Sequence, residues 1–103
     1  MLATDWAEDA VALLRDNAAR NGIELRAERV RWDEPGPLLA GAPWDVVLGA
    51  DLLYEQRNAD LLLELLPRLG GDILLAEPGR PFAGAFLARW DVEEIAERVY
   101  RLR

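Results

Sequence analysis

A short apolar run, Val46–Leu48, leads directly into a group of polar side chains. The run is rich in β-branched residues and ends at Gly49, a pattern typical of a strand buried on both faces of a parallel sheet. Asp51 and Tyr54 follow at once. Ligands of open α/β sheets bind at the carboxyl ends of the strands, so these two side chains are placed for chemistry. The alternative is structural: Asp51 caps a turn and Tyr54 packs against it.

Apolar spacing along the chain predicts an alternation of strands and helices. Only the last segment, Trp90–Arg103, fits a helix and a strand equally well. The order predicts an α/β fold, with a Rossmann-like doubly wound and mostly parallel sheet in a single domain over residues 1–103. The predicted elements are the tail of a strand at Met1–Thr4, a helix over Ala7–Asn21, a charged edge strand over Leu25–Trp32, a buried strand at Val46–Leu48, a helix capped by Asn58, a buried strand at Ile73–Leu75 and a short helix opened by Pro81.

The composition excludes several kinds of site. The chain has 103 residues and no Cys, His, Lys or Ser, which leaves no thiol chemistry, Schiff-base lysine, Ser/His triad or usual zinc ligand, so we predict no metal site. A net charge of -7 argues against nucleic acid as a partner, because binding to a phosphate backbone needs a basic face. No apolar run is long enough to cross a membrane and no signal peptide is apparent, so a cytoplasmic location is the expectation.

Two predicted strands end in an acid beside a tryptophan, at Asp5–Trp6 and at Trp32–Asp33. A carboxylate at such a strand end accepts hydrogen bonds from ribose hydroxyls, and an indole offers a stacking face to adenine. The simpler alternatives are that Asp5 caps the following helix and that both tryptophans belong to the core.

Several segments, taken together and in this order, resemble the class I, seven-β-strand S-adenosylmethionine-dependent methyltransferases. The resemblance is closest to the branch that contains the protein lysine methyltransferases, whose mark is an acid-x-x-Tyr motif after the fourth strand. Asp51-Leu-Leu-Tyr54 fits that motif. The segments that carry the resemblance are Ala3–Trp6, Asn17–Gly22, Trp32–Asp33, Trp44–Tyr54 and Glu77–Arg80.

The resemblance implies S-adenosylmethionine as cofactor and a protein lysine, or a similar nitrogen, as methyl acceptor. It implies that Asp5, beside Trp6, holds the ribose hydroxyls and that Trp32 with Asp33 contacts adenine. Ala50 and Asp51 would line the methionine end of the cofactor and the path of the acceptor amine, with Tyr54 beside them.

One departure from the family shapes the remaining expectations. The family's first strand and glycine-rich loop come before the segment matched by Met1–Asp5, and no Gly-x-Gly follows a strand here. We therefore interpret the chain as the carboxyl-terminal part of a truncated methyltransferase domain, beginning at the second strand. The neighbours of the first strand would then close up or expose unpaired edges, through which the chain could self-associate.

Two other functions stay open on the sequence alone. The first is a non-catalytic remnant that binds a partner through its open sheet edge. The second is a dinucleotide-binding domain of an oxidoreductase, in which Asp5 would still contact ribose. The oxidoreductase alternative ranks lowest, because the chemistry of a nicotinamide enzyme does not require an Asp-x-x-Tyr motif such as Asp51-Leu-Leu-Tyr54.

Overall fold

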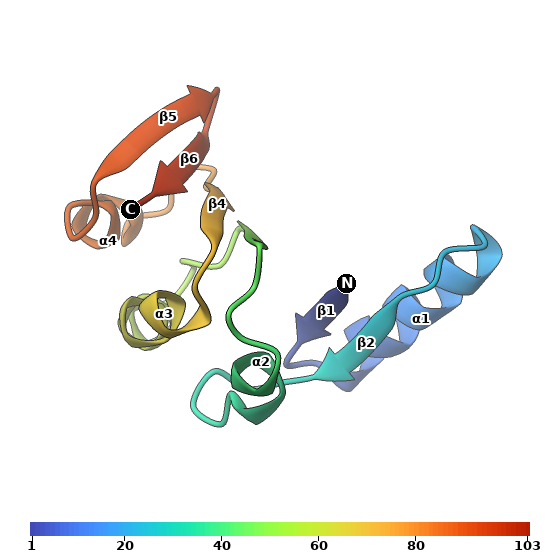
Figure 1. Ribbon diagram of the computed structural model, residues 1–103. Coiled ribbons are helices and arrows are strands. Elements are labelled where there is room, and N and C mark those ends of the chain that lie inside the picture. The colour runs from blue at the N-terminus through green and yellow to red at the C-terminus, as the bar shows by residue number, and fades with distance from the viewer. The chain divides into compact units, whose positions relative to one another are not determined.

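The computed structural model describes residues 1–103 and divides them into two compact units, Met1–Pro37 and Leu38–Arg103 (Figure 1). A short helix, α2 (Gly36–Ala40), spans the boundary in sequence. No helix of the structure is both long and apolar enough to cross a bilayer.

The first unit is a strand–helix–strand element. Strand β1 (Leu2–Asp5) pairs in parallel with β2 (Arg26–Arg29), and helix α1 (Glu8–Arg20) connects them. The helix buries Val11 and Ala18, whereas its first turn carries acids, which the helix dipole favours at that end. The predicted helix over 7–21 is thus confirmed to within one residue at each end. The predicted strand over 25–32 is confirmed in kind but is shorter.

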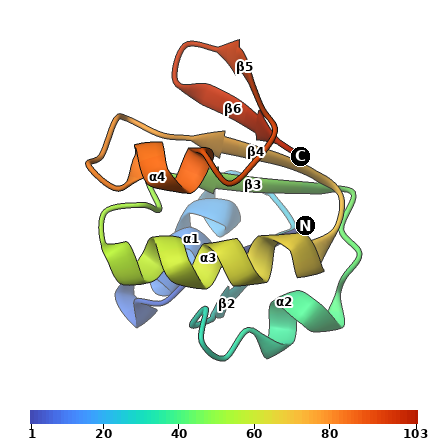
Figure 2. The same cartoon turned by 90° about the vertical axis from the view of Figure 1, so that its left-hand side faces the viewer.

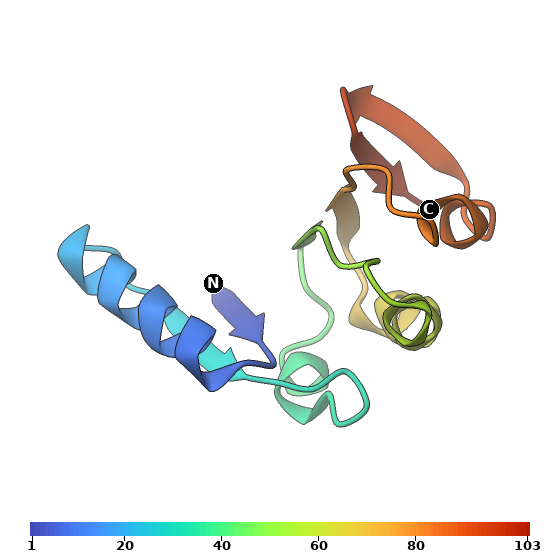
Figure 3. The ribbon, with the colours of Figure 1, turned by 180° about the vertical axis from the view of Figure 1, so that it is seen from behind.

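The second unit is built on a four-stranded sheet in the order β3-β4-β6-β5. Strand β3 (Val46–Ala50) runs parallel to β4 (Asp72–Ala76), with helix α3 (Gln56–Leu69) as the connection between them. Helix α4 (Ala83–Leu87) follows β4. Both helices lie on the same side of β3 and β4, as Figures 1 and 3 show.

The core of the second unit lies between these helices and one face of the sheet. Helix α3 turns a row of leucines inward, and Phe86 of α4 is 1% exposed. From the sheet, Ile73 and Leu75 point to the same core. Figure 2 shows α3 and α4 in front of β3 and β4. The buried apolar residues of α3 are Ala59, Leu62, Leu65, Leu66 and Leu69.

Two expectations for this unit are wrong. Strand β3 is not buried on both faces, because Val46 and Leu48 are 52% and 73% exposed. Side chains of a strand alternate between faces, and both helices of the unit cover the opposite face. Asn58 is not the cap of α3, since the helix begins at Gln56 and Glu55 occupies the cap position without a side-chain hydrogen bond.

The last segment forms a hairpin of β5 (Val92–Ala96) and β6 (Val99–Leu102), so its strand alternative is confirmed and its helix alternative is wrong. Pairing of β6 with β4 decides between them, because it buries Leu102 opposite Ile73. On the outer face an ion pair joins Arg101 to Asp72 at 2.9 Å. Long-range pairing of this kind overrides local periodicity.

The coarse prediction of a mixed α/β fold with parallel strands is confirmed, by the pairs β1-β2 and β3-β4. Each pair also has an open side: β1 bonds to β2 alone, and β3 bonds to β4 alone.

Candidate functional site

The carboxyl ends of β3 and β4 bring two acids to one edge of the sheet. Asp51 follows β3 and Glu77 follows β4, and the two strands are parallel neighbours. The backbone N–H of Asp51 donates to the carbonyl of Ala76 at 2.9 Å. Asp51 has a φ of 50°, in the left-handed region that aspartate tolerates better than most residues. The chain therefore turns sharply at Asp51 and aims its carboxylate away from the strand.

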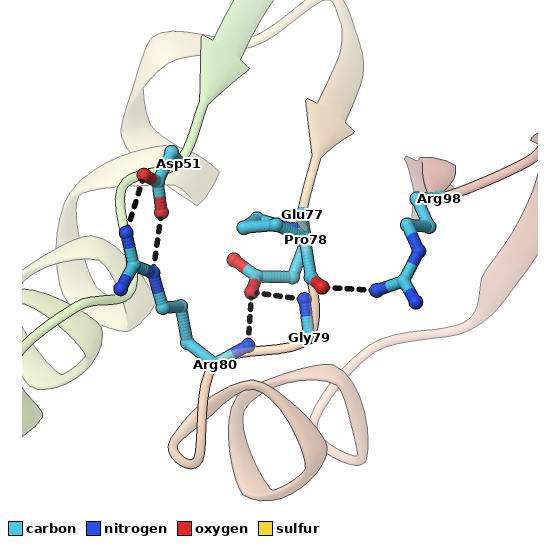
Figure 4. Close-up of polar contacts among 6 residues, drawn as sticks. All are labelled: Asp51, Glu77, Pro78, Gly79, Arg80 and Arg98. Carbon is cyan, nitrogen blue, oxygen red and sulfur yellow. Dashed lines mark hydrogen bonds and ion pairs between the residues drawn. The ribbon is translucent and has the colours of Figure 1, made fainter.

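The carboxylate of Asp51 is held by the guanidinium of Arg80. Nε donates to Oδ1 at 2.9 Å and Nη2 donates to Oδ2 at 2.8 Å, as Figure 4 shows. Both side chains are 46% exposed. These hydrogen bonds lower the pKa of the Asp51 carboxyl, and the same carboxylate raises the pKa of Arg80. Asp51 thus pairs with Arg80 through its side chain instead of capping a turn.

Glu77 organises the loop that carries Arg80. It is 2% exposed, and its Oε1 accepts hydrogen bonds from the backbone N–H groups of Gly79 at 3.0 Å and Arg80 at 2.7 Å. Its Oε2 is buried and has no partner. The backbone N–H of Glu77 donates to the carbonyl of Arg98 at 2.9 Å, and the Arg98 guanidinium donates to the carbonyl of Pro78 (Figure 4). The loop after β4 is therefore fixed from two sides.

Sequence reasoning gave neither Glu77 nor Arg80 a role in the site. The pattern that could have indicated them is an acid directly after an apolar strand, followed by Pro78-Gly79, which forces a turn. Gly79 has a φ of +103°, a backbone conformation that L side chains rarely adopt, so the turn favours glycine.

The other predicted residues of this unit border the same edge. Ala50 is the last residue of β3 and is exposed. Tyr54 lies in the loop from β3 to α3 and is 42% exposed, whereas Leu53 beside it is fully buried. Leu53 anchors the loop in the core and leaves the Tyr54 ring open to solvent.

In the first unit, Asp5 is the last residue of β1 and Trp6 follows it. Oδ1 of Asp5 accepts a hydrogen bond from the backbone N–H of Ala7 at 2.9 Å, which leaves Oδ2 without a protein donor. Ala7 occupies the cap position of α1, so Asp5 supports the turn but is not the helix cap. The core alternative for Trp6 is wrong, since Trp6 is 61% exposed. Its carbonyl accepts a hydrogen bond from Nε of Arg29 at 2.8 Å.

Trp32 and Asp33 lie in a tight turn just beyond β2. The turn is closed by the backbone N–H of Glu34 on the carbonyl of Arg31 at 3.0 Å, and Arg31 pairs with Asp33 at 2.7 Å. Trp32 is half-buried. Because β1 and β2 are parallel and the backbone N–H of Val30 bonds the Asp5 carbonyl at 3.0 Å, these residues leave the same edge of the two-stranded sheet as Asp5.

The predicted residues thus form two groups, one in each unit. The first group offers an open carboxylate oxygen on Asp5 and an exposed indole on Trp6. The second group offers a carboxylate that already has a guanidinium partner and an exposed phenol ring. The structure contains no cluster of three or more acids that could ligate a metal ion.

Parallel strands that end in acids, with an Asp-x-x-Tyr stretch after one of them, agree with the class that comparisons with known proteins support, the class I S-adenosylmethionine-dependent methyltransferases. Within that class, residues 1–76 match the family model described as lysine methyltransferase, and the chain belongs to this family. S-adenosylmethionine is the methyl donor of the class.

Curated relatives agree with this assignment. The chain is 32% identical over 102 residues to the ribosomal protein L11 methyltransferase of Serratia proteamaculans (strain 568), covering 94% of this chain and 33% of the relative. The protein of the same name from Yersinia pseudotuberculosis serotype IB (strain PB1/+) is 31% identical, with the same coverage. The chain therefore spans about a third of the length of these relatives.

Proposed function

We propose that the chain forms part of a methyltransferase that uses S-adenosylmethionine to methylate a nitrogen atom of a protein, with a lysine side chain as acceptor. The observation that carries the proposal is Asp51, placed at the carboxyl end of β3 and followed by Leu52-Leu53-Tyr54 within the segment that matches the family. The names of the relatives, which specify a ribosomal protein, support a protein acceptor. A cytoplasmic location is part of the same proposal.

The nucleoside part of the cofactor is assigned to the first unit. Asp5 would accept hydrogen bonds from the ribose hydroxyls through its open Oδ2, with Trp6 beside it. Trp32 and Asp33 would border adenine from the turn after β2. For the two groups of residues to serve one cofactor, both parallel pairs must belong to one doubly wound sheet, and that arrangement is part of the proposal.

The methyl group is assigned to the second unit. S-adenosylmethionine, when bound, supplies an electrophilic methyl group on a sulfonium sulfur. Ala50 would border its methionine end. Methyl transfer needs little acid or base catalysis, but the amine has to arrive unprotonated and in line. The Asp51 carboxylate and the Tyr54 ring would orient the amine and stabilise the positive charge that it acquires.

Calorimetric titration of the chain with S-adenosylhomocysteine tests cofactor binding, with NADH as the matched control. We expect saturable heat with the first compound and none with NADH. Heat with NADH alone would favour the dinucleotide-binding alternative. Absence of heat with both would contradict a cofactor site in this chain and favour the non-catalytic binding module.

A transfer assay tests the acceptor. The chain is incubated with methyl-labelled S-adenosylmethionine and ribosomal protein L11, and with L11 whose lysines have been acetylated. Label on the native protein alone supports lysine as the acceptor. Equal label on both would move the proposal to another nitrogen.

A further inference from the structure

The geometry of the Asp51–Arg80 pair fixes the carboxylate in one orientation. Two parallel N–H···O bonds of 2.9 and 2.8 Å join a planar guanidinium to a planar carboxylate, which prevents rotation of the carboxylate about its own axis. A lysine could neutralise the same charge but could not form this fork. An exposed aspartate on a turn would otherwise sample several rotamers.

The backbone of Arg80 is held in place by the side chain of Glu77. The buried carboxylate of Glu77 accepts both the Gly79 and the Arg80 backbone N–H groups, so the Arg80 backbone cannot swing away from Asp51. Burying a carboxylate with one unpartnered oxygen costs stability. The Glu77 carboxylate makes no other hydrogen bond to a protein group, and its evident effect is to hold this loop.

We infer that Arg80 is a positioning residue of the acceptor site: it orients the Asp51 carboxylate and balances its charge, and Glu77 holds the loop that presents Arg80. The inference rests on the proposed function, in which Asp51 receives the acceptor amine. An unpaired carboxylate would stabilise the ammonium form of that amine, which cannot attack a methyl group. A carboxylate whose charge is partly balanced by Arg80 stabilises the ammonium form less, so that more of the amine is neutral and able to attack.

The surrounding charges come from three segments. Glu77 and Arg80 follow β4, Arg98 extends from the turn between β5 and β6, and Glu55 shares the loop of Asp51 with the phenol of Tyr54. Among these groups, only Arg80 makes a direct ion pair with Asp51.

The test is a titration of the Asp51 carboxyl by carbon NMR in the whole 103-residue chain. We compare the wild type with Arg80→Lys and Arg80→Gln. The titration midpoint of Asp51 is expected to rise with Arg80→Gln, and to rise less with Arg80→Lys, which keeps the charge but not the fork. Arg101→Gln is the matched control, because it breaks the Asp72–Arg101 pair of the same unit and should leave Asp51 unchanged. Equal midpoints in the wild type and Arg80→Gln would overturn the inference.

The role of Glu77 is tested by a pair of substitutions. Glu77→Gln keeps an acceptor oxygen for the two backbone N–H groups, whereas Glu77→Met has a similar length and no acceptor. We expect the first to leave the Asp51 midpoint near that of the wild type and the second to raise it as Arg80→Gln does. If Glu77→Met does not fold, the Arg80 series still decides, since Arg80 is exposed. A midpoint raised by Glu77→Gln as much as by Glu77→Met would contradict the role of the acceptor oxygen.

These titrations require no cofactor. Failure to bind S-adenosylhomocysteine would therefore contradict the proposed function and leave the Arg80 result standing. An unchanged Asp51 midpoint would overturn the inference even in a chain that binds the cofactor.

Discussion

Asp51 and Arg80 are 29 residues apart in the sequence, yet both oxygens of the Asp51 carboxylate accept hydrogen bonds from the Arg80 guanidinium. They meet because β3 and β4 are parallel neighbours, so the loops that leave their carboxyl ends lie at one edge of the sheet. A contact of this kind depends on strand order, which sequence spacing alone does not contain.

The pair predicts a pH dependence of stability. Arg80 lowers the pKa of Asp51 in the folded chain. Such a group stabilises the fold fully above its unfolded pKa, about 3.9 for aspartate, and loses this contribution as the pH falls through the lower, folded value. We therefore expect the stability advantage of the wild type over Asp51→Asn to be constant near neutral pH and to vanish in the acid range. The effect is small because the pair is half exposed.

Thermal unfolding followed by circular dichroism across the acid range measures this difference. Asp60→Asn, on the exposed face of α3, serves as the control for the general effect of protonating carboxylates. If the difference in melting temperature between the wild type and Asp51→Asn is the same at every pH, the result is inconsistent with a stabilising Asp51–Arg80 pair.

Gly71 should tolerate no side chain. It has a φ of +77°, and a Cβ there would lie 2.1 Å from the backbone oxygen of Trp44. That backbone is fixed, since the Trp44 N–H bonds the Leu69 carbonyl at 2.9 Å. We expect Gly71→Ala to reduce the free energy of unfolding by about 2–4 kcal/mol. Gly22→Ala is the control: its φ is +63° and nothing lies within 4 Å of the added Cβ, so only about 1 kcal/mol of backbone strain applies. Equal losses in urea denaturation would show that the close approach to Trp44 does not matter.

Replacing a leucine by alanine should reduce the free energy of unfolding far more at a buried position of α3 than at an exposed position of α1. Leu62 of α3 is 2% exposed, whereas Leu13 of α1 is 59% exposed. Leu62→Ala removes buried methyl groups and leaves a cavity, which we expect to cost about 2–5 kcal/mol. Leu13→Ala should lie within about 0.5 kcal/mol of the wild type, because alanine favours helix and little burial is lost. Urea denaturation of both variants provides the comparison, and similar midpoints would contradict the assigned core.

Local pattern was sufficient to predict most helices and strands. Apolar spacing located α1 to within one residue at each end, because an amphipathic helix carries its own periodicity. It failed for β3, where an apolar run such as Val46–Leu48 does not reveal which face will be covered. The segment from Trp90 was ambiguous because β5 and β6 pair with each other, and β6 with β4, through contacts that local periodicity does not contain.

In the candidate site, too, local sequence predicts some residues, whereas others depend on the three-dimensional structure. Asp5 and Asp51 were predictable, because an acid directly after an apolar strand marks a strand end. Glu77 carries the same signal directly after β4, but its hold on the loop and the contact of Arg80 with Asp51 depend on the loop geometry after β4, which the sequence does not contain. The two tryptophans show that local sequence does not determine burial. Both lie beside an acid in the sequence, yet Trp6 is exposed and Trp32 is half-buried.

The last prediction concerns the proposed ribose contact of Asp5. Asp5→Asn keeps the Oδ1 that accepts the Ala7 N–H, so the turn into α1 is preserved, but it replaces the open Oδ2 by an amide donor. A ribose hydroxyl then loses a charged acceptor, which lowers affinity for S-adenosylhomocysteine by about tenfold or more. Asp9→Asn is the matched control, because it removes the same charge from the exposed first turn of α1. Calorimetry on both variants separates the outcomes: equal weakening would indicate a general charge effect, and unchanged affinity in Asp5→Asn would remove Asp5 from the nucleoside site.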